Sequence, residues 1–472
     1  MKLTLIKGDK LGSDTDYRDA LPENMYAVKK EILGAAGYLL NYDGLTQIAT
    51  GFGIDRGGFY NENFEEQYRV SGTKFISIDD EFNVTEIGDV AGSDQAILED
   101  LYSPNTQGII ANNRFYLYNG VSTFTEVTDP DLGDPIDGVW INGVYFLTDG
   151  TYVYHTDVGD ETSIDPLKYS TADFMPDPVK GVAKTQDNKV IVFGRFSLEF
   201  FVYDATSDFS FTRIETRAQK IGIVSTHGKC ETRENFYILG GRRREAIGVH
   251  AIGLGTTTKV SNREIDKIIA EYPEDRLFDA KLESRVQNDT VFVLLHLPDY
   301  VLCFNETIAS TLGKDFAWSL LKSKEETSPY DDMVYRAVNG VYDPRSNAWV
   351  YGDKNGTRIG KLDSSVSTQY GELVEWVLYT PLVLMESLSI DEIELKTIPG
   401  HTTEAVTTLA VSLTYDGVIF GSEIWLDYGE KYNYNKRLIA GPFGYCNEKV
   451  GFKFRGLSLG RVAFGLLNLK VS

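Results

Sequence analysis

The sequence predicts an all-β fold, in which a β-propeller of six or seven blades precedes a β-sandwich-like platform domain. The first observation is composition: 28 Tyr and 25 Phe accompany 44 Gly but only 14 Pro, and aromatic residues favour strands while glycines favour tight turns. The second is that short runs of alternating apolar and polar residues are separated by turns rich in Gly, Asn and Asp, as in hairpins. The third is that these runs recur with a nearly constant spacing.

Residues 1–45 differ from the rest, because they lack the regular hairpins. Their notable stretches are residues 14–17, Leu21–Met25 and Lys29–Gly34. These stretches indicate an extended arm with one short strand and one helical turn. Since a propeller brings its two chain ends close together, we expect this arm to pack with the C-terminal domain.

Residues 46–366 contain the repeated hairpins and are predicted to form the propeller. The clearest runs are Tyr68–Ile76, Arg114–Gly120, Val144–Tyr154, Val190–Gly194, Asn235–Gly240, Val291–Leu295 and Trp349–Asp353. The intervals that begin at Tyr68, Val144 and Val190 have about the length of one four-stranded blade. The interval that begins at Phe115 is shorter and later ones are longer, which indicates insertions or a missing strand. Two β-sandwiches are the alternative, since they would show the same hairpins without a constant period.

One helix is expected within the propeller segment. Residues 261–272 begin with a capping residue, place Ile265, Ile268 and Ile269 on one face, and precede Pro273, which stops the helix.

Residues 367–472 return to alternating strands and, together with the arm, are predicted to form the sandwich-like platform. The expected strands are Val374–Thr380, Ser389–Thr397, Thr407–Thr414, followed by a turn at Asp416–Gly417, and Val450–Leu459.

The net charge of −23 argues against a protein that grips DNA. Phosphate binding needs clustered Lys and Arg, and the chain has no such surplus. An acidic surface that lines a channel would let DNA pass without sticking; alternatively, the charge only keeps a large assembly subunit soluble. The first residues have too short an apolar run for a signal peptide, and no stretch reaches the length of a membrane span. The three scattered cysteines, with no disulfide framework, fit folding in a reducing cytoplasm.

No residue pattern indicates catalysis, a cofactor or a metal. The three cysteines are far apart, the five histidines stand alone, and His296 lies in an apolar strand where a structural role is expected. The densest carboxylate cluster, Asp129–Asp137, would suit glycoside hydrolysis at the right separation, yet its Pro and Gly content is that of a solvated loop. Arg242, Arg243 and Arg244 form the only strongly basic run of the sequence. Two interpretations are open: the run contacts phosphate or an acidic partner, or it is a solvated loop.

Several collinear segments together resemble the packaged-DNA stabilisation proteins, also called tail accessory factors, tail hubs or nozzles, of short-tailed Salmonella-type bacteriophages. They are residues 17–25, 30–33, 37–39, 68–74, 87–93, 296–298, 332–337, 352–354, 360–362, 367–371, 380–382, 436–437 and 450–455. Together they span nearly the whole chain, although residues 100–290 look much less alike. The chain is therefore similar to this family at both ends of the sequence.

The resemblance implies a non-enzymatic virion protein, made in the host cytoplasm, that forms a homo-hexameric ring beneath the portal–adaptor complex. It would close the portal channel after packaging, retain the genome, form part of the ejection conduit without specific DNA binding, and contact a tailspike or tail fibre and a needle or plug. The candidate assembly contacts lie in the arm and the C-terminal part: Tyr17, Leu21, Pro22, Asn24, Met25, Arg437, Phe452 and Arg455. The alternative function is a propeller glycoside hydrolase or carbohydrate-binding adhesin that acts on host surface polysaccharide.

Overall fold

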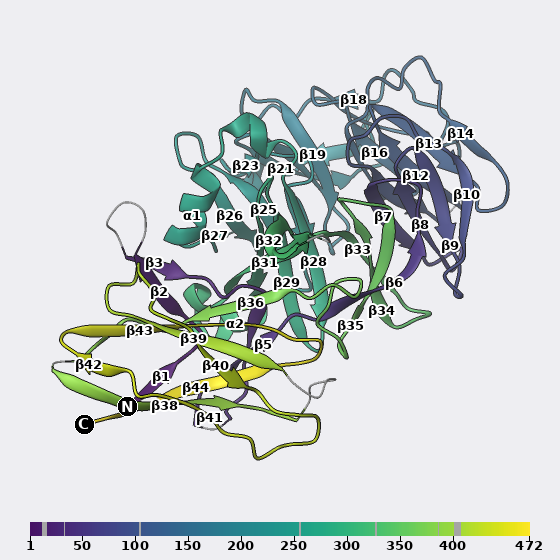
Figure 1. Ribbon diagram of the computed structural model, residues 1–472. Helices are drawn as coiled ribbons and strands as arrows, with labels where there is room; N and C mark the ends of the chain where they lie inside the picture. Colours follow the sequence, from purple (N-terminus) through teal and green to yellow (C-terminus); the bar gives the residue numbers. More distant parts are fainter. Residues whose placement is uncertain are drawn as a thin grey trace. The chain divides into compact units, whose positions relative to one another are not determined.

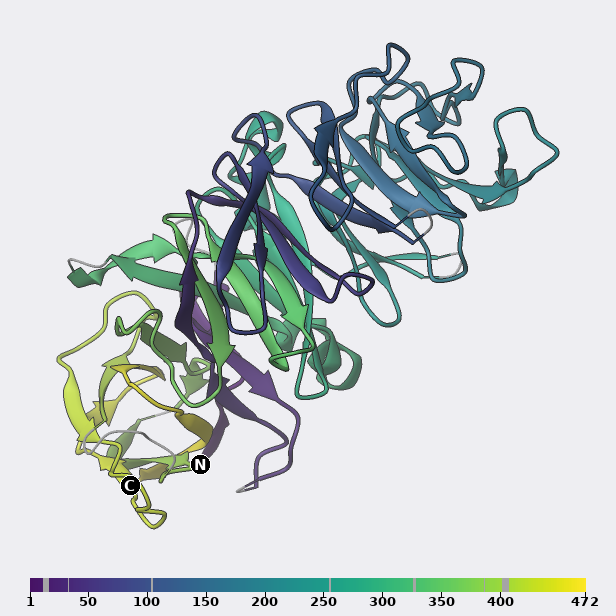
Figure 2. The ribbon, with the colours of Figure 1, turned by 90° about the vertical axis from the view of Figure 1, so that its right-hand side faces the viewer.

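The computed structural model describes residues 1–11, 17–32, 34–102, 105–253, 256–325, 328–385, 387–400 and 407–472. Strands dominate these residues (Figures 1 and 2), which confirms the all-β prediction. The chain forms two compact units. The first contains residues 1–46, 284–336 and 362–472, and the second contains residues 47–283 and 337–361.

The second unit is built from antiparallel sheets that follow one another along the chain (Figure 1). The first two sheets are β7 (Asp55–Asn61), β8 (Glu66–Ser71), β9 (Lys74–Ile78) and β10 (Val84–Asp89), then β11 (Ile97–Leu101), β12 (Thr106–Ala111), β13 (Arg114–Tyr118) and β14 (Phe124–Glu126). The next two are β15 (Asp137–Ile141), β16 (Val144–Thr148), β17 (Val153–His155) and β18 (Tyr169–Ser170), then β19 (Val179–Lys184), β20 (Val190–Gly194), β21 (Leu198–Tyr203) and β22 (Phe211–Arg213). The fifth is β23 (Gly222–Ile223), β24 (Lys229–Glu231), β25 (Phe236–Gly241), β26 (Gly248–Ile252) and β27 (Thr257–Lys259).

Two further sheets complete the series. The sixth is β28 (Lys281–Gln287), β29 (Thr290–His296), β30 (Val301–Asn305), β31 (Trp318–Glu325) and β32 (Ser328–Val334), most of which belongs to the first compact unit. The seventh is β33 (Ala337–Asp343), β34 (Ala348–Asp353), β35 (Arg358–Asp363) and β6 (Gly44–Thr50). The described residues therefore contain seven blade-sized sheets. The last one borrows its edge strand from the start of the chain, a pairing that the hairpin pattern alone did not predict.

Each pair of neighbouring sheets in the second unit shares a hydrophobic cluster, as a propeller requires. Strands at one edge of each sheet contact their counterparts in the next, from β33 through β7, β11 and β15 to β19. Between the first two sheets the cluster is rich in aromatic rings: Phe75 stacks on Phe124 with ring centroids 5.4 Å apart, and Tyr68 meets Tyr118 edge-on at 5.8 Å. The high aromatic content thus fills the spaces between blades.

The uneven spacing of the predicted hairpins has a simple cause. Val144 and Val190 lie in the second strands of their sheets, whereas Phe115 lies in the third strand of its own. No strand is missing from that sheet. The longer intervals downstream reflect insertions, as expected: a helix separates the fifth and sixth sheets, and another lies within the sixth.

The predicted helix is present as α1 (Arg263–Ala270), which begins two residues later than expected. Asn262 caps it, since its side-chain oxygen accepts a hydrogen bond from the Ile265 amide at 3.0 Å. A second helix, α2 (Glu306–Leu312), was not predicted; Asn305 caps it in the same way. The remaining helical turns are 3-10 segments at Glu215–Arg217, Glu274–Leu277 and Lys314–Phe316.

The sandwich in the first unit combines strands from both chain ends, as predicted. One sheet contains β1 (Lys2–Thr4), β4 (Met25–Val28), β5 (Tyr38–Asn41), β38 (Leu388–Thr397), β41 (Leu438–Ala440), β42 (Gly444–Cys446) and β44 (Ala463–Val471). The other contains β36 (Glu375–Tyr379), β37 (Val383–Leu384), β39 (Thr408–Thr414), β40 (Ile424–Asp427) and β43 (Lys449–Leu457). Trp376 from the second sheet packs on Phe464 from the first, with ring centroids 4.8 Å apart.

The arm is richer in strands than predicted. Besides β1, β4 and β5 it contributes the hairpin of β2 (Gly8–Leu11) and β3 (Tyr17–Ala20), and its described residues form no helix. The domain boundaries at residues 45 and 366 stay a prediction, because the compact units group the sixth sheet with the sandwich.

Candidate functional site: a polar cavity at the inner edges of the blades

A cavity of about 490 Å³ lies within the second unit, where edge strands of several sheets converge. Charged side chains from five strands line it: Glu99 on β11, Asp137 on β15, Lys184 on β19, Lys229 on β24 and Lys281 on β28. Charged groups that are half-buried or buried need partners, because the surrounding protein solvates them less well than water. The partners of these groups determine what the cavity can do.

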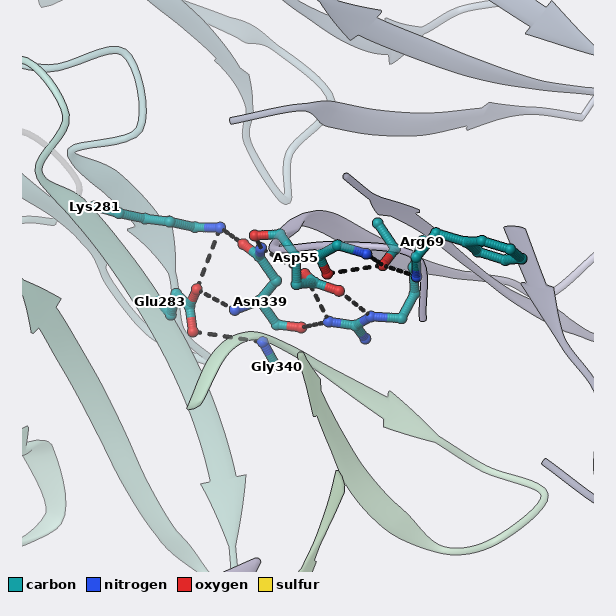
Figure 3. A network of polar contacts seen from close by, with 9 residues as sticks. Asp55, Arg69, Lys281, Glu283, Asn339 and Gly340 are labelled. Carbon is teal, nitrogen blue, oxygen red and sulfur yellow. Dashed lines mark hydrogen bonds and ion pairs between the residues drawn. The ribbon is translucent and has the colours of Figure 1, made fainter. Parts of the chain in front are cut away.

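A buried ion pair in the first sheet is joined to the last sheet through Asn339 (Figure 3). Arg69 on β8 donates to Asp55 on β7 through Nε at 2.7 Å and Nη2 at 3.0 Å, a bidentate arrangement. The same Nη2 donates to the Asn339 carbonyl of β33 at 2.8 Å, and Asn339 Nδ2 returns a bond to Asp55 at 2.7 Å. Arg69 and Asp55 are 0 and 2% exposed. Through Asn339, the pair therefore joins β7 and β8 to β33, which lies far along the chain.

The network continues to the sixth sheet. Glu283 on β28 accepts hydrogen bonds from the Asn339 amide at 2.7 Å and the Gly340 amide at 3.4 Å, and forms an ion pair with Lys281 at 3.2 Å. Lys281 also donates to the Asn339 side chain. Asn339 lies at a β-bulge of β33 and has a φ of 56°, a left-handed conformation that Asn tolerates well. The bulge gives Asn339 contacts to both neighbouring sheets.

Gly352 on β34 permits the close approach of the first and last sheets. A Cβ at this position would lie 2.0 Å from Cγ of Asp55. We expect Gly352→Ala to lower the free energy of unfolding by about 1–3 kcal/mol, because the added methyl must displace the buried carboxylate. Chemical denaturation measures this. Gly356→Ala is the matched control, since its Cβ would meet nothing closer than 3.5 Å; equal effects of the two substitutions would contradict the prediction.

Asp137 and Lys229 form the second buried pair of the cavity. Their Oδ2 and Nζ atoms are 2.6 Å apart, and the carboxylate also accepts from the Val182 amide of the next sheet at 2.8 Å. Lys229 donates further to the Thr226 carbonyl at 2.7 Å. His227 lies beside them, and burial together with Lys281 and Lys229 holds the pKa of its imidazole well below the usual value. These groups hold the sheets together and leave the imidazole neutral.

Glu99 carries the most perturbed acidic group of the cavity. Its carboxyl is surrounded by protein, and burial, with Asp100 and Asp137 nearby, raises its pKa to about 8. The folded chain therefore keeps a proton that the unfolded chain releases near its ordinary pKa of about 4.3. Since unfolding releases a proton between these two values, stability is expected to fall as pH rises from about 5 to 8.

Substituting Glu99 tests this linkage. We expect Glu99→Gln to remove the part of the pH dependence that Glu99 contributes, so that the variant gains stability relative to the parent as pH rises towards 8. Thermal unfolding midpoints at pH 5, 6.5 and 8 measure the difference. An identical pH profile for parent and variant would show that the carboxyl is ionised in the folded chain throughout this range.

The carboxylates and the histidine that the sequence singled out have structural surroundings. In the part of the chain that the structure describes, no group of three His, Cys, Asp or Glu residues is placed to hold a metal ion. In the carboxylate-rich loop, Asp129 accepts the Asp131 amide of its own turn at 2.8 Å, and Asp137 is the buried partner of Lys229. His296 is 5% exposed in the apolar strand β29, where it was expected. Asp129 and Asp137 are thus engaged by neighbouring groups, and His296 is buried in the fold.

The predicted assembly residues of the arm lie mainly inside the subunit. Pro22 and Asn24 are buried and Met25 is 0% exposed, whereas Leu21 is half-buried. The backbone at Pro22–Asn24 runs between β31 and β36: the Asn24 amide donates to Leu320 at 2.8 Å, and the Glu23 amide to Val377 at 2.8 Å. Tyr17 lies in β3. The side chains of Asn24 and Met25 thus face the interior of the first unit, whereas the sequence analysis expected them to make assembly contacts.

The predicted assembly residues of the C-terminal part are likewise partly buried and partly exposed. Phe452 is 1% exposed in the core of the sandwich, so it offers no surface of the subunit. Arg437 is exposed, and its hydrogen bond to Glu394 at 2.6 Å holds the pKa of that carboxyl at about 2. Arg455 is half-buried and binds Glu423 and Glu375. Of the predicted C-terminal contacts, Arg437 and Arg455 therefore remain as residues at the surface of the subunit.

The basic run forms the turn between β25 and β26. All three arginines, Arg242, Arg243 and Arg244, are exposed, and Arg242 lies 3.7 Å from Glu245. Arg244 has a φ of 72°. The run is therefore an exposed basic turn of the second unit.

No helix of the described residues is long and apolar enough to cross a membrane. Seven blade-sized sheets, a sandwich and buried polar pairs that join strands define a β-propeller protein with an attached β-sandwich. The chain belongs to the bacteriophage P22 Gp10 family: the β-propeller model of this family matches residues 1–367 and its β-sandwich model matches residues 375–472. This confirms the predicted fold class and the suspected family.

The tail hub protein gp10 of Salmonella phage P22 is 29% identical over 473 residues, which is 96% of each chain. Among solved structures, the extracellular domain of a putative one component system from B. thetaiotaomicron has a TM-score of 0.42 and 10% identity, over 69% of this chain and 41% of that chain. A virginiamycin B lyase from Staphylococcus aureus has a TM-score of 0.41 and 12% identity, over 69% of this chain and 99% of that chain.

Proposed function

We propose that this chain is a structural tail hub protein of a bacteriophage virion, without enzymatic activity. The observation that carries the proposal is the match of both family models, which cover the propeller and the sandwich, together with a tail hub relative aligned over 96% of the chain. The contacts of the buried cavity side chains support a structural role, because they join strands of different sheets.

In this proposal the subunits form a homo-hexameric ring beneath the portal–adaptor complex in the phage tail. The cavity inside one subunit, about 490 Å³, has the size of a small-molecule site. It is too small for a DNA duplex, so a conduit for DNA would have to form between subunits. The net charge of −23 supports a wall along which DNA slides, and holding the genome would then mean closing the channel physically.

Residues at the surface of the subunit would contact the portal–adaptor, a tailspike or fibre, and a needle or plug. Arg437 and Arg455 in the sandwich and Leu21 in the arm are our candidates, with Tyr17 in the adjacent hairpin. Pro22, Asn24, Met25 and Phe452 would support this surface from within. Arg242–Arg244 would face phosphate or an acidic partner.

Heads that carry portal and adaptor but lack this chain provide the test. Adding the purified chain is expected to protect packaged DNA from nuclease and to place six copies in a ring under the adaptor in electron micrographs. Unprotected DNA with the chain bound would reject closure, and failure to bind would reject the tail hub role. Deleting residues 1–20 is expected to prevent binding, and charge reversal of Arg242–Arg244 to lower DNA retention.

A further inference from the structure

A second, apolar pocket of about 240 Å³ opens in the second unit between the fourth and fifth sheets. Its floor consists of Ile191 on β20, Phe200 on β21, Phe236 on β25 and Ile252 on β26. Ile191, Phe200 and Ile252 are 2, 8 and 5% exposed. An apolar hollow open at one side costs free energy when filled with water, because its walls lose the contacts that a packed side chain would make.

The mouth of the pocket is acidic. Asp187, Glu231 and Glu234 lie there with a single basic residue, Arg217. Asp187 is already engaged by Lys189 and lies 3.6 Å from Arg217. Within the described ranges, neither Glu231 nor Glu234 forms an ion pair. The mouth therefore presents two carboxylates that a cation from outside can approach.

The pocket adjoins the polar cavity. Thr185, Gln186, Glu231 and Phe236 line both, and Gln186 donates to the Arg233 carbonyl at 3.0 Å in the wall between them. An extended ligand could thus place one group in the pocket and its neighbours over the wall. A volume of about 240 Å³ is below the range of about 300–1,000 Å³ typical of sites for whole small molecules, and suits one large side chain.

We propose that this pocket binds a short segment of a partner protein, in which one large apolar residue is flanked by Lys or Arg. The apolar side chain fills the floor formed by Ile191, Phe200 and Ile252, and the basic neighbour pairs with Glu231 and Glu234. The acidity of the whole chain favours the approach of such a basic segment. The inference rests on the proposed function, since a hub must hold other proteins, but its test uses the isolated chain.

The probe is a short fluorescent peptide with one Phe between two Lys, and fluorescence anisotropy measures its affinity for the purified full-length chain. Replacing Phe by Ser, or both Lys by Glu, in the peptide is expected to weaken binding at least about tenfold. In the chain, Glu231→Lys with Glu234→Lys is expected to weaken binding of the original peptide to a similar degree. Asp80→Lys with Glu81→Lys, at an exposed turn, is the control with the same change in charge.

A second variant tests the floor. Phe236→Trp adds volume at the wall of the pocket and is expected to weaken the Phe peptide more than the Ser peptide, while thermal unfolding verifies the fold. No peptide binding up to millimolar concentration, equal binding of the Phe and Ser peptides, or an equal effect of the control reversal would overturn the proposal. So would a change in self-association of the Glu231 and Glu234 variant, measured by sedimentation without peptide, since it would assign the pocket to a second copy of this chain. DNA retention in the head assay tests the tail hub role separately.

Discussion

Replacing Asp55 by Ala is expected to lower the free energy of unfolding by about 3–5 kcal/mol, the range measured when one partner of a buried ion pair is removed. The substitution leaves the guanidinium of Arg69, which is 0% exposed, without its carboxylate. It also removes the carboxylate acceptor of Asn339 Nδ2, which keeps only the longer bond to the Asp55 carbonyl at 3.4 Å. Because these residues join the first and last sheets, the loss weakens the closure of the propeller. Urea denaturation of parent and variant measures the difference.

Two controls separate the buried pair from charge in general. Arg114 and Glu126 form an exposed pair at 3.0 Å, and Glu126→Ala is expected to cost less than about 1 kcal/mol. The double substitution Asp55→Leu with Arg69→Met removes both charges, so it is expected to cost less than Asp55→Ala alone. If Asp55→Ala costs no more than Glu126→Ala, the pair does not hold the sheets together.

This ion pair shows where reasoning from the sequence ends. The alternation of Tyr68–Ile76 predicted a hairpin correctly, because strand patterns depend on neighbouring residues. Nothing near Arg69 in the sequence indicates that its partners are Asp55 and Asn339, which lie on other strands. Charged residues are usually exposed, so a buried arginine is recognised only when the sheets are assembled.

The fold class was predictable because hairpins and helix caps depend on residues that are neighbours in the sequence. Hairpin spacing favoured a propeller, and capping with a stop at Pro273 located α1. The strand β6 was not recognised as the edge of the last sheet, because its partner β35 lies far along the chain. Asn24 was expected to make assembly contacts because the arm resembles the family, and its burial depends on β31 and β36, which lie far along the chain. Long-range pairing, which single-sequence patterns do not encode, accounts for these differences.

Replacing Asn24 by Ala is expected to lower the free energy of unfolding by at least about 3 kcal/mol. The Asn24 side chain donates to the Glu375 carbonyl of β36 at 2.8 Å and accepts from the Lys322 amide of β31 at 2.9 Å. Removing it leaves these two backbone groups without that partner, at about 1–3 kcal/mol for each buried group that stays unsatisfied. Asn24 also has a φ of 52°, where Ala costs about 1–2 kcal/mol.

Two further substitutions separate these contributions to the free energy of unfolding. Asn113 has a φ of 58° in an exposed turn, so Asn113→Ala is expected to show the backbone cost alone, about 1 kcal/mol. Asn24→Gly relieves the backbone strain but not the lost hydrogen bonds, so it is expected to cost less than Asn24→Ala and more than Asn113→Ala. If Asn24→Ala and Asn113→Ala cost the same, the side chain of Asn24 does not hold β31 and β36 together. Deleting residues 1–20 leaves residues 22–24 in place, so this truncation is expected to keep the hydrogen bonds of Asn24 to β31 and β36. Asn24→Ala removes these hydrogen bonds while the rest of the arm stays in place.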